Sequence, residues 1–257
     1  MGADGAPLAA ITASRKLVIG CINWPPFAKF HRDGSSVSFS ELYVEVLQEI
    51  GRRNNIDVQF LPTRASQIVP QLENAQVDAI ACLLETPQRR HLGEVVDARF
   101  GVPVIGVVRK EGVAKWNPQR LRDRSTIVAA VVGEVGEEVA RTRYGATCEN
   151  GRLITIDTDY VPGVFLQIAL GNADIALVSG TRWLQYCKDV DPAEINLCCV
   201  FADLPLLLVP CGVFVRANCD ELRDWLDREL YEMWDRPELQ ERCRQIVEDY
   251  GPFIVPL

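Results

Sequence analysis

The sequence QLENAQVDAI at residues 71–80 is echoed 96 positions later by QIALGNADIA at residues 167–176. Each copy ends a helical pattern at a small residue, turns, and enters an apolar run typical of a buried strand. Each copy also lies within its own alternation of strand-like and helix-like segments. A ten-residue echo can arise by convergence on a common helix–turn–strand solution, but we interpret this one as the mark of two similar α/β lobes.

The segments around the first copy alternate between short apolar runs and amphipathic stretches. They predict strands at 16–22, 58–61 and 77–84, and helices at 39–52 and 65–74. Such alternation is typical of a mainly parallel sheet. The sequence SFSE, from Ser38 to Glu41, predicts a capping box at the start of the first helix. The buried face of that helix is expected to contain Phe39, Leu42, Tyr43, Val46, Leu47 and Ile50.

Two extended apolar runs, at 101–109 and 204–215, flank the second copy and predict two strand-like crossings between the lobes. Two more helices are expected after the second crossing, one opened by Asn218 and one by Asp235. They can pack on the first lobe only if the chain has returned to it. We therefore predict an α/β fold of two Rossmann-like lobes joined by two hinge strands, with a small ligand enclosed between the lobes. Lobe 1 would comprise 16–102 plus 211–257, lobe 2 would comprise 103–210, and 1–15 would be a disordered or processed segment.

Composition limits the possible partners. The 257 residues have a formal net charge of −8, with no block of like charge longer than Arg52-Arg53 and Arg89-Arg90, which disfavours nucleic acid and anionic membranes. The most apolar stretch, 204–215, has about half the length of a membrane span. The nine cysteines contain no C-x-x-C spacing and the chain has two histidines, so we predict no metal site. We find no dinucleotide fingerprint or P-loop, and expect no cofactor, a small-molecule partner and a monomer.

Several motifs in this order resemble one known family. They are WPPF at 24–27, a helix beginning near Glu41, the motif at 71–80, and TPQR at 86–89 with Asp97 downstream. From Lys16 to Tyr250 the chain resembles the type II periplasmic solute-binding proteins of the amino-acid-binding kind, family 3, whose fold is shared by the ligand cores of ionotropic glutamate receptors. The resemblance implies the periplasmic binding protein type II fold.

The resemblance also implies two ligand contacts: Trp24 would stack on the ligand, and Arg89 would bind its carboxylate. Arg89 has independent support, because Thr86 as a cap and Pro87 at the first helical position would place Arg89 in a first turn, where backbone N–H groups and the guanidinium converge on an anion. The alternatives are a solvated surface arginine for Arg89 and, for Trp24, a wall residue packing on the adjacent prolines.

The chain departs from the family pattern at three places. Leu84 stands where the family usually has a hydroxyl, Gly133-Glu134-Val135 replaces a Gly-Thr-Thr, and Ser179 stands where an acid usually pairs with an α-ammonium group. These departures favour a carboxylate-bearing, partly apolar or aromatic ligand over an ordinary α-amino acid. Glu134 could face the ligand, act as an acid or base, or face solvent in a first helical turn.

The predicted ligand-binding set comprises Trp24, Phe27, Cys82, Leu84, Arg89, Gly133, Glu134, Val135 and Ser179, with no catalytic residue and no metal ligand. Glu41 is left outside the set because the capping box would occupy its carboxylate.

The leading functional hypothesis is a binding protein that captures a small carboxylate-bearing solute, amino-acid-like or an organic acid, for a membrane transporter permease. The alternatives are a periplasmic dehydratase of the same fold acting on prephenate or arogenate, and the ligand-sensing domain of a signalling receptor. The resemblance implies a periplasmic location. Met1–Thr12 lacks the basic start and the continuous apolar core of a signal peptide, so we expect that the signal peptide is absent from this sequence. Cys187 and Cys243 have about the spacing of a bridge in some eukaryotic relatives, but the vicinal Cys198-Cys199 leaves the connectivity open.

Overall fold

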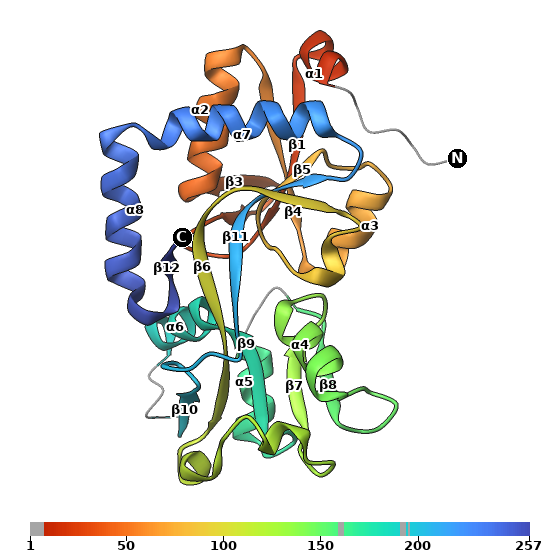
Figure 1. Cartoon of the computed structure of the whole chain (residues 1–257), viewed down its shortest axis with the longest axis vertical. Helices are drawn as coiled ribbons and strands as arrows, with labels where there is room; N and C mark the ends of the chain where they lie inside the picture. The colour runs from red at the N-terminus through yellow and green to blue at the C-terminus, as the bar shows by residue number, and fades with distance from the viewer. Residues whose placement is uncertain (1–7, 159–161, 191–193, 195) are drawn as a thin grey trace. The chain divides into compact units, whose positions relative to one another are not determined.

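The computed structural model describes residues 8–158, 162–190, 194 and 196–257, which divide into two compact units (Figure 1). Unit 1 comprises Met1–Gly101, Pro210–Asp249 and Pro256–Leu257, and unit 2 comprises Val102–Val209 and Tyr250–Val255. The last segment of unit 2 lies in a stretch that the sequence assigned to lobe 1. Leu8–Ser14 forms helix α1 with Ile11 buried, rather than the disordered segment expected there, while residues 1–7 lie outside the described residues.

Unit 1 contains a sheet with the strand order β4-β1-β5-β11-β6. Strand β1 runs parallel to both β4 and β5, whereas β11 runs antiparallel to β5. Helix α2 packs against β4, β5 and α7. Strands β2 and β3 form a separate hairpin. The elements are β1 Lys16–Ile22, β2 Lys29–Asp33, β3 Ser36–Ser40, α2 Leu42–Asn54, β4 Asp57–Thr63, α3 Ile68–Glu73, β5 Ala79–Leu84, β6 Gly93–Arg109, β11 Leu207–Arg216, α7 Asp220–Trp234, α8 Pro237–Tyr250 and β12 Val255–Pro256.

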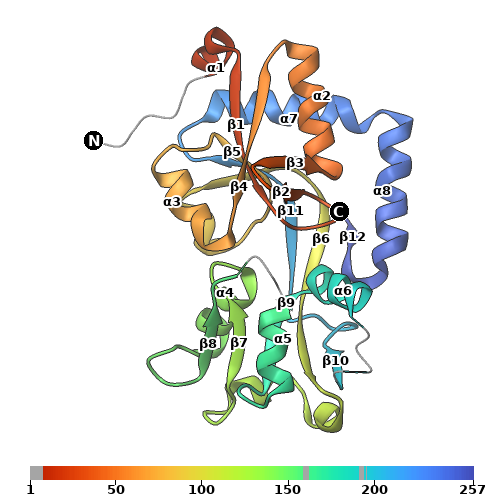
Figure 2. The ribbon, with the colours of Figure 1, turned by 180° about the vertical axis from the view of Figure 1, so that it is seen from behind.

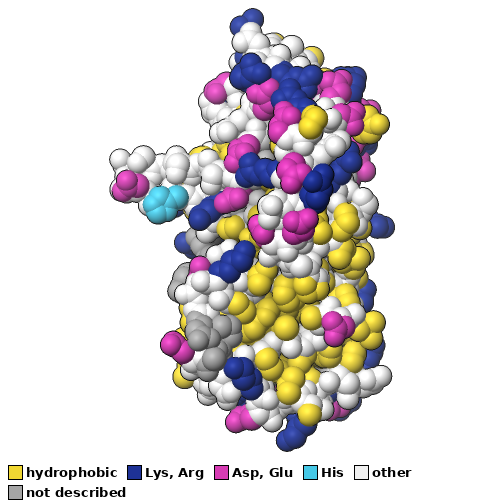
Figure 3. Space-filling model, turned by 90° about the vertical axis from the view of Figure 1, so that its left-hand side faces the viewer, with side chains coloured by type: hydrophobic (Ala, Val, Ile, Leu, Met, Phe, Trp, Pro, Cys, Tyr) yellow, Lys and Arg dark blue, Asp and Glu magenta, His cyan; other side chains and the backbone are white. Residues whose placement is uncertain are grey.

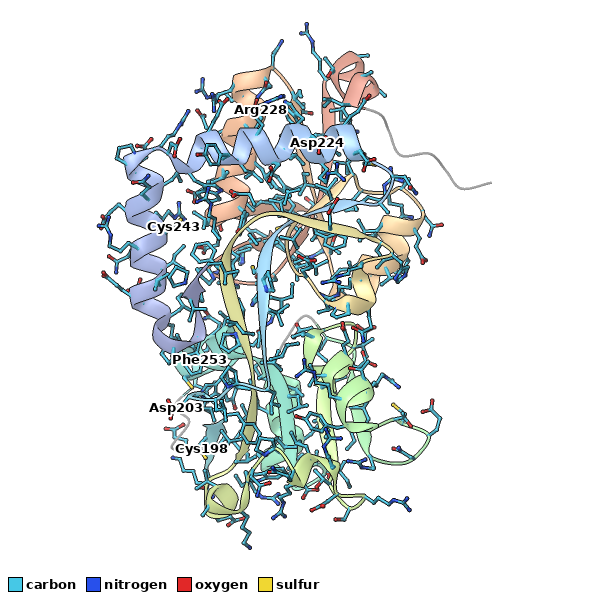
Figure 4. The ribbon with its side chains drawn as sticks, in the orientation of Figure 1. Cys198, Asp203, Asp224, Arg228, Cys243 and Phe253 are labelled. Atoms are coloured by element: carbon cyan, nitrogen blue, oxygen red, sulfur yellow. The ribbon has the colours of Figure 1, made fainter. Side chains whose placement is uncertain are left out.

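Unit 2 repeats this plan, with the strand order β6-β9-β7-β8 and β10 paired to β6. Strand β7 runs parallel to β8 and β9, and β6 runs antiparallel to β9 (Figure 2). Its core includes the rings of Phe165, Trp183 and Tyr186, and Phe253 near the C-terminus joins it (Figure 4). The elements are β7 Val128–Val131, α4 Val135–Tyr144, β8 Leu153–Ile156, α5 Pro162–Ala169, β9 Ile175–Ser179, α6 Gly180–Asp189 and β10 Leu197–Val200.

The repeated sequence motif makes the same backbone contacts in both units. The Asp78 carboxylate accepts a hydrogen bond from the Val18 N–H at 2.9 Å, and the Asp78 N–H donates to the Val18 carbonyl at 2.8 Å. The Asp174 carboxylate and N–H make the same two bonds with Ile127, each at 2.8 Å. Each aspartate thus joins the turn before one central strand to the start of the neighbouring strand. This confirms the prediction of two similar α/β lobes.

The capping box predicted for the first helix is absent. Ser38 and Phe39 belong to the hairpin strand β3, and α2 begins at Leu42 after Glu41, which has φ 85° and makes no side-chain cap bond. The Phe39 ring instead contacts the Phe60 ring at a centroid distance of 5.4 Å. The rest of the predicted apolar face is buried. The cap predicted at Asn218 is also wrong, because α7 is preceded by Cys219.

Among the described residues, no helix combines the length and the apolar character that a membrane crossing requires. On unit 2, apolar side chains gather over β10 and the segment that leads from it into β11 (Figure 3). Leu204, in this segment, is 75% exposed, and Leu208, in the second position of β11, is 45% exposed.

Candidate functional site

The predicted ligand residues of unit 1 follow two neighbouring parallel strands. Trp24 follows β1 and Arg89 follows β5, and these strands pair in parallel through Ile19 and Ala79. Parallel neighbours place their carboxyl ends at the same edge of a sheet, which is where ligands bind in open α/β sheets. The topology therefore brings the Trp24 and Arg89 segments to one edge of unit 1.

Trp24 lies in a tight turn that contains a cis Pro25–Pro26 peptide. Its N–H donates to the Ala28 carbonyl at 2.7 Å, and its carbonyl accepts from the Phe27 N–H at 3.0 Å. The residue is 5% exposed, and its indole meets the Phe27 ring edge-on at a centroid distance of 5.3 Å. The turn fixes the position of the indole, and stacking on a ligand stays a prediction.

Phe27 is fully buried in an aromatic cluster of unit 1. Its ring lies 5.3 Å from the Phe100 ring and 6.1 Å from the Tyr43 ring, between centroids. The structure thus assigns Phe27 to the core behind Trp24 rather than to a ligand-facing surface, because its ring has no exposed area to offer a ligand.

Arg89 is only 8% exposed, so the alternative of a solvated surface arginine is wrong. Its Nη1 donates to the Leu84 carbonyl at 2.9 Å, which holds the guanidinium against the end of β5. Pro87 begins the turn as predicted, but the helix is a single 3₁₀ turn, Pro87–Arg89, and the Thr86 side chain makes no cap bond. The bond to the Leu84 carbonyl is one of the contacts that position Arg89, and the predicted contribution of a helix terminus is not present.

Cys82 and Leu84 lie on β5 and are almost fully buried. Leu84 contributes its carbonyl to Arg89, in addition to the apolar side chain noted in the sequence. The sulfur of Cys82 lies 3.0 Å from the sulfur of Cys211 on the neighbouring strand β11. Cys82 therefore contacts another cysteine.

The predicted residues of unit 2 occupy the equivalent edge of its sheet. Gly133 and Glu134 follow β7, and Ser179 ends β9, a strand parallel to β7. Gly133 adopts φ 76°, and its N–H donates to the Glu137 carboxylate at 2.7 Å. Gly136 lies where an added Cβ would come within 1.9 Å of the Leu177 carbonyl, so the first turn of α4 lies directly on the β9 backbone. Gly133 thus permits a tight turn, and Gly136 permits close packing of α4 on β9.

Glu134 forms an ion pair with Arg182 in α6. Its Oε1 lies 2.8 Å from the Arg182 Nη2, and the two side chains are 14% and 11% exposed. The solvent-facing alternative for Glu134 is therefore wrong. Val135 is 2% exposed, and the Ser179 hydroxyl, also buried, lies 3.1 Å from the Thr181 hydroxyl.

Sequence reasoning missed Arg182, Glu137 and Cys211. Arg182 lies three residues after Ser179, in the first turn of the helix that follows β9. Its place directly after a predicted strand end is the signal that could have suggested it. Glu137 lies in the first turn of α4 and could have been found in the same way. Cys211 had no local signal, since its approach to Cys82 depends on strand register.

Several titratable groups away from these strand ends have shifted pKa values. Burial raises the pKa of Asp97, partly offset by its contact with Arg99, whose Nε lies 3.1 Å from the carboxylate. Burial also raises the pKa of Cys187, in unit 2, and of Cys243, on α8 of unit 1 (Figure 4), each to about 11. The structure has no S–S bond among the nine cysteines, and the implied Cys187–Cys243 bridge stays a prediction. Within the described ranges, no group of three or more His, Cys, Asp or Glu side chains is placed to bind a metal ion.

Comparison with known proteins gives a family match and a shared fold. Residues 17–249 match the model of the bacterial extracellular solute-binding proteins, family 3. The solute receptor for L-cysteine of Neisseria gonorrhoeae superposes with a TM-score of 0.74 at 18% identity, covering 96% of each chain. The amino acid ABC transporter substrate-binding protein AbpA of Streptococcus pneumoniae, bound to L-arginine, gives 0.72 at 14% identity, covering 94% of this chain and 98% of AbpA.

A third solved structure is the ancestral amino acid-binding protein AncCDT-1, a precursor of cyclohexadienyl dehydratase. Its TM-score is 0.70 at 18% identity, and the match covers 95% of this chain and 98% of that protein. At such identities these likenesses establish the fold alone. No curated protein matches the chain in sequence.

Proposed function

Because the chain belongs to family 3 of the bacterial extracellular solute-binding proteins, we propose that it binds a small carboxylate-bearing solute, with Arg89 holding the carboxylate. The observation that carries this proposal is the burial of the Arg89 guanidinium beside the end of β5, at the sheet edge that Trp24 also reaches. A planar guanidinium fork matches a carboxylate through two parallel hydrogen bonds. The bond to the Leu84 carbonyl orients the fork for this role.

The proposed ligand class is argued from the side chains at the strand ends of each unit. Trp24 supplies an aromatic surface, and Leu84 stands where a hydroxyl would be expected for an amino acid carboxylate. In unit 2, the Glu134 carboxylate is already paired with Arg182, so an ammonium group would have to compete with a buried guanidinium for it. The proposed ligand is therefore an organic acid, or an amino-acid-like molecule whose ammonium group contributes little to binding.

In the proposed role, the protein delivers this solute to a membrane transporter permease outside the cytoplasm. The family's extracellular location supports that role, and AbpA, of the same fold, is an ABC transporter substrate-binding protein. A ligand-sensing domain of a receptor would bind the same solute but would pass the signal to an attached partner. The dehydratase alternative has support in the fold of AncCDT-1, but the Glu134 carboxylate that it would use as acid or base is engaged by Arg182.

The direct test is isothermal titration of the wild-type protein with aliphatic, aromatic and dicarboxylic acids and the standard amino acids. The best ligand is then titrated into Arg89→Ala and Arg89→Lys. Truncating one member of a buried charge pair costs about 2–5 kcal/mol, so Arg89→Ala should weaken binding by about 30-fold or more. Arg89→Lys should recover only part of this affinity, because an ammonium group lacks the planar fork.

Arg90→Ala is the matched control, because this neighbouring arginine has a side chain that is 70% exposed. It should leave the affinity unchanged. Unchanged affinity in Arg89→Ala, with a thermal unfolding transition like that of the wild type, would refute the carboxylate role. Incubation with prephenate and arogenate tests the enzyme alternative: product formation with turnover would replace the binding-protein proposal by the dehydratase.

A further inference from the structure

Two cysteines meet where β5 and β11 run side by side in unit 1. In the antiparallel register Cys211 lies opposite Leu84, so Cys82, two residues before Leu84, faces the same side of the sheet as Cys211. The register shifts between Gly212 and Phe214, beside Cys82. Such a bulge increases the local twist of the strands. The result is a diagonal pair of side chains in direct contact.

The sulfur atoms of this pair are 3.0 Å apart. An S–S bond is about 2.05 Å long, whereas nonbonded heavy atoms usually lie about 3.5–4.0 Å apart, as carbon atoms do. Both side chains are almost fully buried, at 1% and 0% exposure. The two thiols are therefore held in contact by the sheet itself and need only a small shift to bond.

We propose that Cys82 and Cys211 form a disulfide in the exported protein. The two thiols lose two protons and two electrons to a disulfide oxidant such as glutathione disulfide, which becomes two glutathione thiols. One cysteine first forms a mixed disulfide with the oxidant, and the thiolate of the other then displaces glutathione from it. Because both side chains are buried in the folded state, the exchange takes place before unit 1 closes over them. The extracellular location of the family supplies oxidising conditions.

This bond would join two functionally important strands of unit 1. Cys211 is the second residue of the segment by which the chain returns to unit 1. Cys82 is two residues before Leu84, whose carbonyl holds Arg89. The disulfide would thus fasten the returning strand to the strand that positions the proposed carboxylate site. The bond itself depends on strand register and not on any ligand.

The test begins with protein refolded in a buffer of reduced and oxidised glutathione. The protein is denatured without reductant, alkylated with iodoacetamide, and weighed intact. The wild type should take up seven labels, because the disulfide removes two of its nine thiols from alkylation. Cys82→Ser and Cys211→Ser should each take up eight, because each releases the partner. The matched control Cys21→Ser removes a different buried cysteine, from β1, and should take up six.

Tryptic mapping without reductant identifies the bonded pair in the wild type, so the result does not depend on whether a variant folds. The peptide 65–89 should be linked to the peptide 189–216. The second peptide also contains Cys198 and Cys199, so the map is repeated with the double variant Cys198→Ser/Cys199→Ser, in which the link should persist. Nine labels on the wild type would overturn the proposal and indicate an S–H···S contact. A link from Cys82 or Cys211 to a different cysteine would overturn it equally. The number of labels does not depend on whether Arg89→Ala loses ligand binding, so the disulfide proposal and the carboxylate proposal can fail separately.

Discussion

The ion pair between Glu134 and Arg182 makes a quantitative prediction about unit 2. Its two side chains come from the starts of α4 and α6, each of which follows a central strand of the sheet. With side chains that are 14% and 11% exposed, the pair is close to the buried limit, where solvent screening is weak. We expect each single truncation, Glu134→Ala and Arg182→Ala, to destabilise the protein strongly.

The magnitude follows from desolvation. Removing one partner of a buried ion pair takes the opposite charge away from a desolvated group and costs about 3–5 kcal/mol, whereas exposed pairs contribute about 0–1 kcal/mol. The small remaining exposure of both groups places the expected loss near the lower end, at about 3 kcal/mol for each variant. The double variant removes both charges together, so its loss should be smaller than the sum of the single losses by about 1–3 kcal/mol.

The assay is a double-mutant cycle of urea unfolding. Tryptophan fluorescence together with far-ultraviolet circular dichroism follows the unfolding of both units, with Trp183 in the core of unit 2 and Trp24 and Trp234 in unit 1. Arg182 has further contacts besides Glu134, and the cycle separates them because they cancel in the coupling term. A coupling energy within about 0.3–0.5 kcal/mol of zero, the range of independent sites, would show that the pair does not form and would return Glu134 to the groups available to a ligand.

Three further predictions concern the framework. Asp78→Ala and Asp174→Ala should each lower the free energy of unfolding by about 1–3 kcal/mol in chemical denaturation, because each leaves a strand N–H without its acceptor. Burial raises the pKa of Asp78, so the folded state binds a proton at this carboxyl more tightly than the unfolded state does. The stability that this proton contributes is present at low pH and is lost as pH rises through the pKa of the folded state. Asp78→Asn should therefore flatten that part of a plot of stability against pH. Gly136→Ala should lower the melting temperature because its Cβ would overlap the β9 backbone, whereas Gly163→Ala, whose Cβ would meet side chains at 3.6 Å or more, should be tolerated.

The framework was predictable where local sequence determines it. The repeated motif indicated both lobes because its aspartate bonds a neighbouring strand start through a turn that the sequence itself specifies. The first strand was predicted with the bounds of β1. The first helix was predicted three residues early because Ser38 pairs with His31 in the β2–β3 hairpin. That pairing overrode a local capping signal.

The candidate site was predictable to a smaller extent. The TPQR motif pointed to Arg89, but the orientation of its side chain depends in part on a bond to the Leu84 carbonyl, which no side-chain pattern reveals. Glu134 and Arg182 are 48 residues apart in the sequence, so their pairing depends on the order of β7 and β9 in the sheet. Without that order, a first-turn glutamate is most simply interpreted as a solvated one.

The repeated plan of the two units separates what folds the chain from what selects a ligand. The same aspartate bonds join neighbouring strands in both units, so substitutions there should affect stability. The residues beyond the strand ends differ in charge, with Arg89 after β5 and the Glu134–Arg182 pair in unit 2. Since the guanidinium of Arg182 already neutralises Glu134, substitution of Arg182 by a neutral residue would release an acid in unit 2. We therefore expect a stable Arg182→Gln variant to shift its ligand preference toward cationic amino acids. An unchanged preference would place Glu134 outside the ligand's reach.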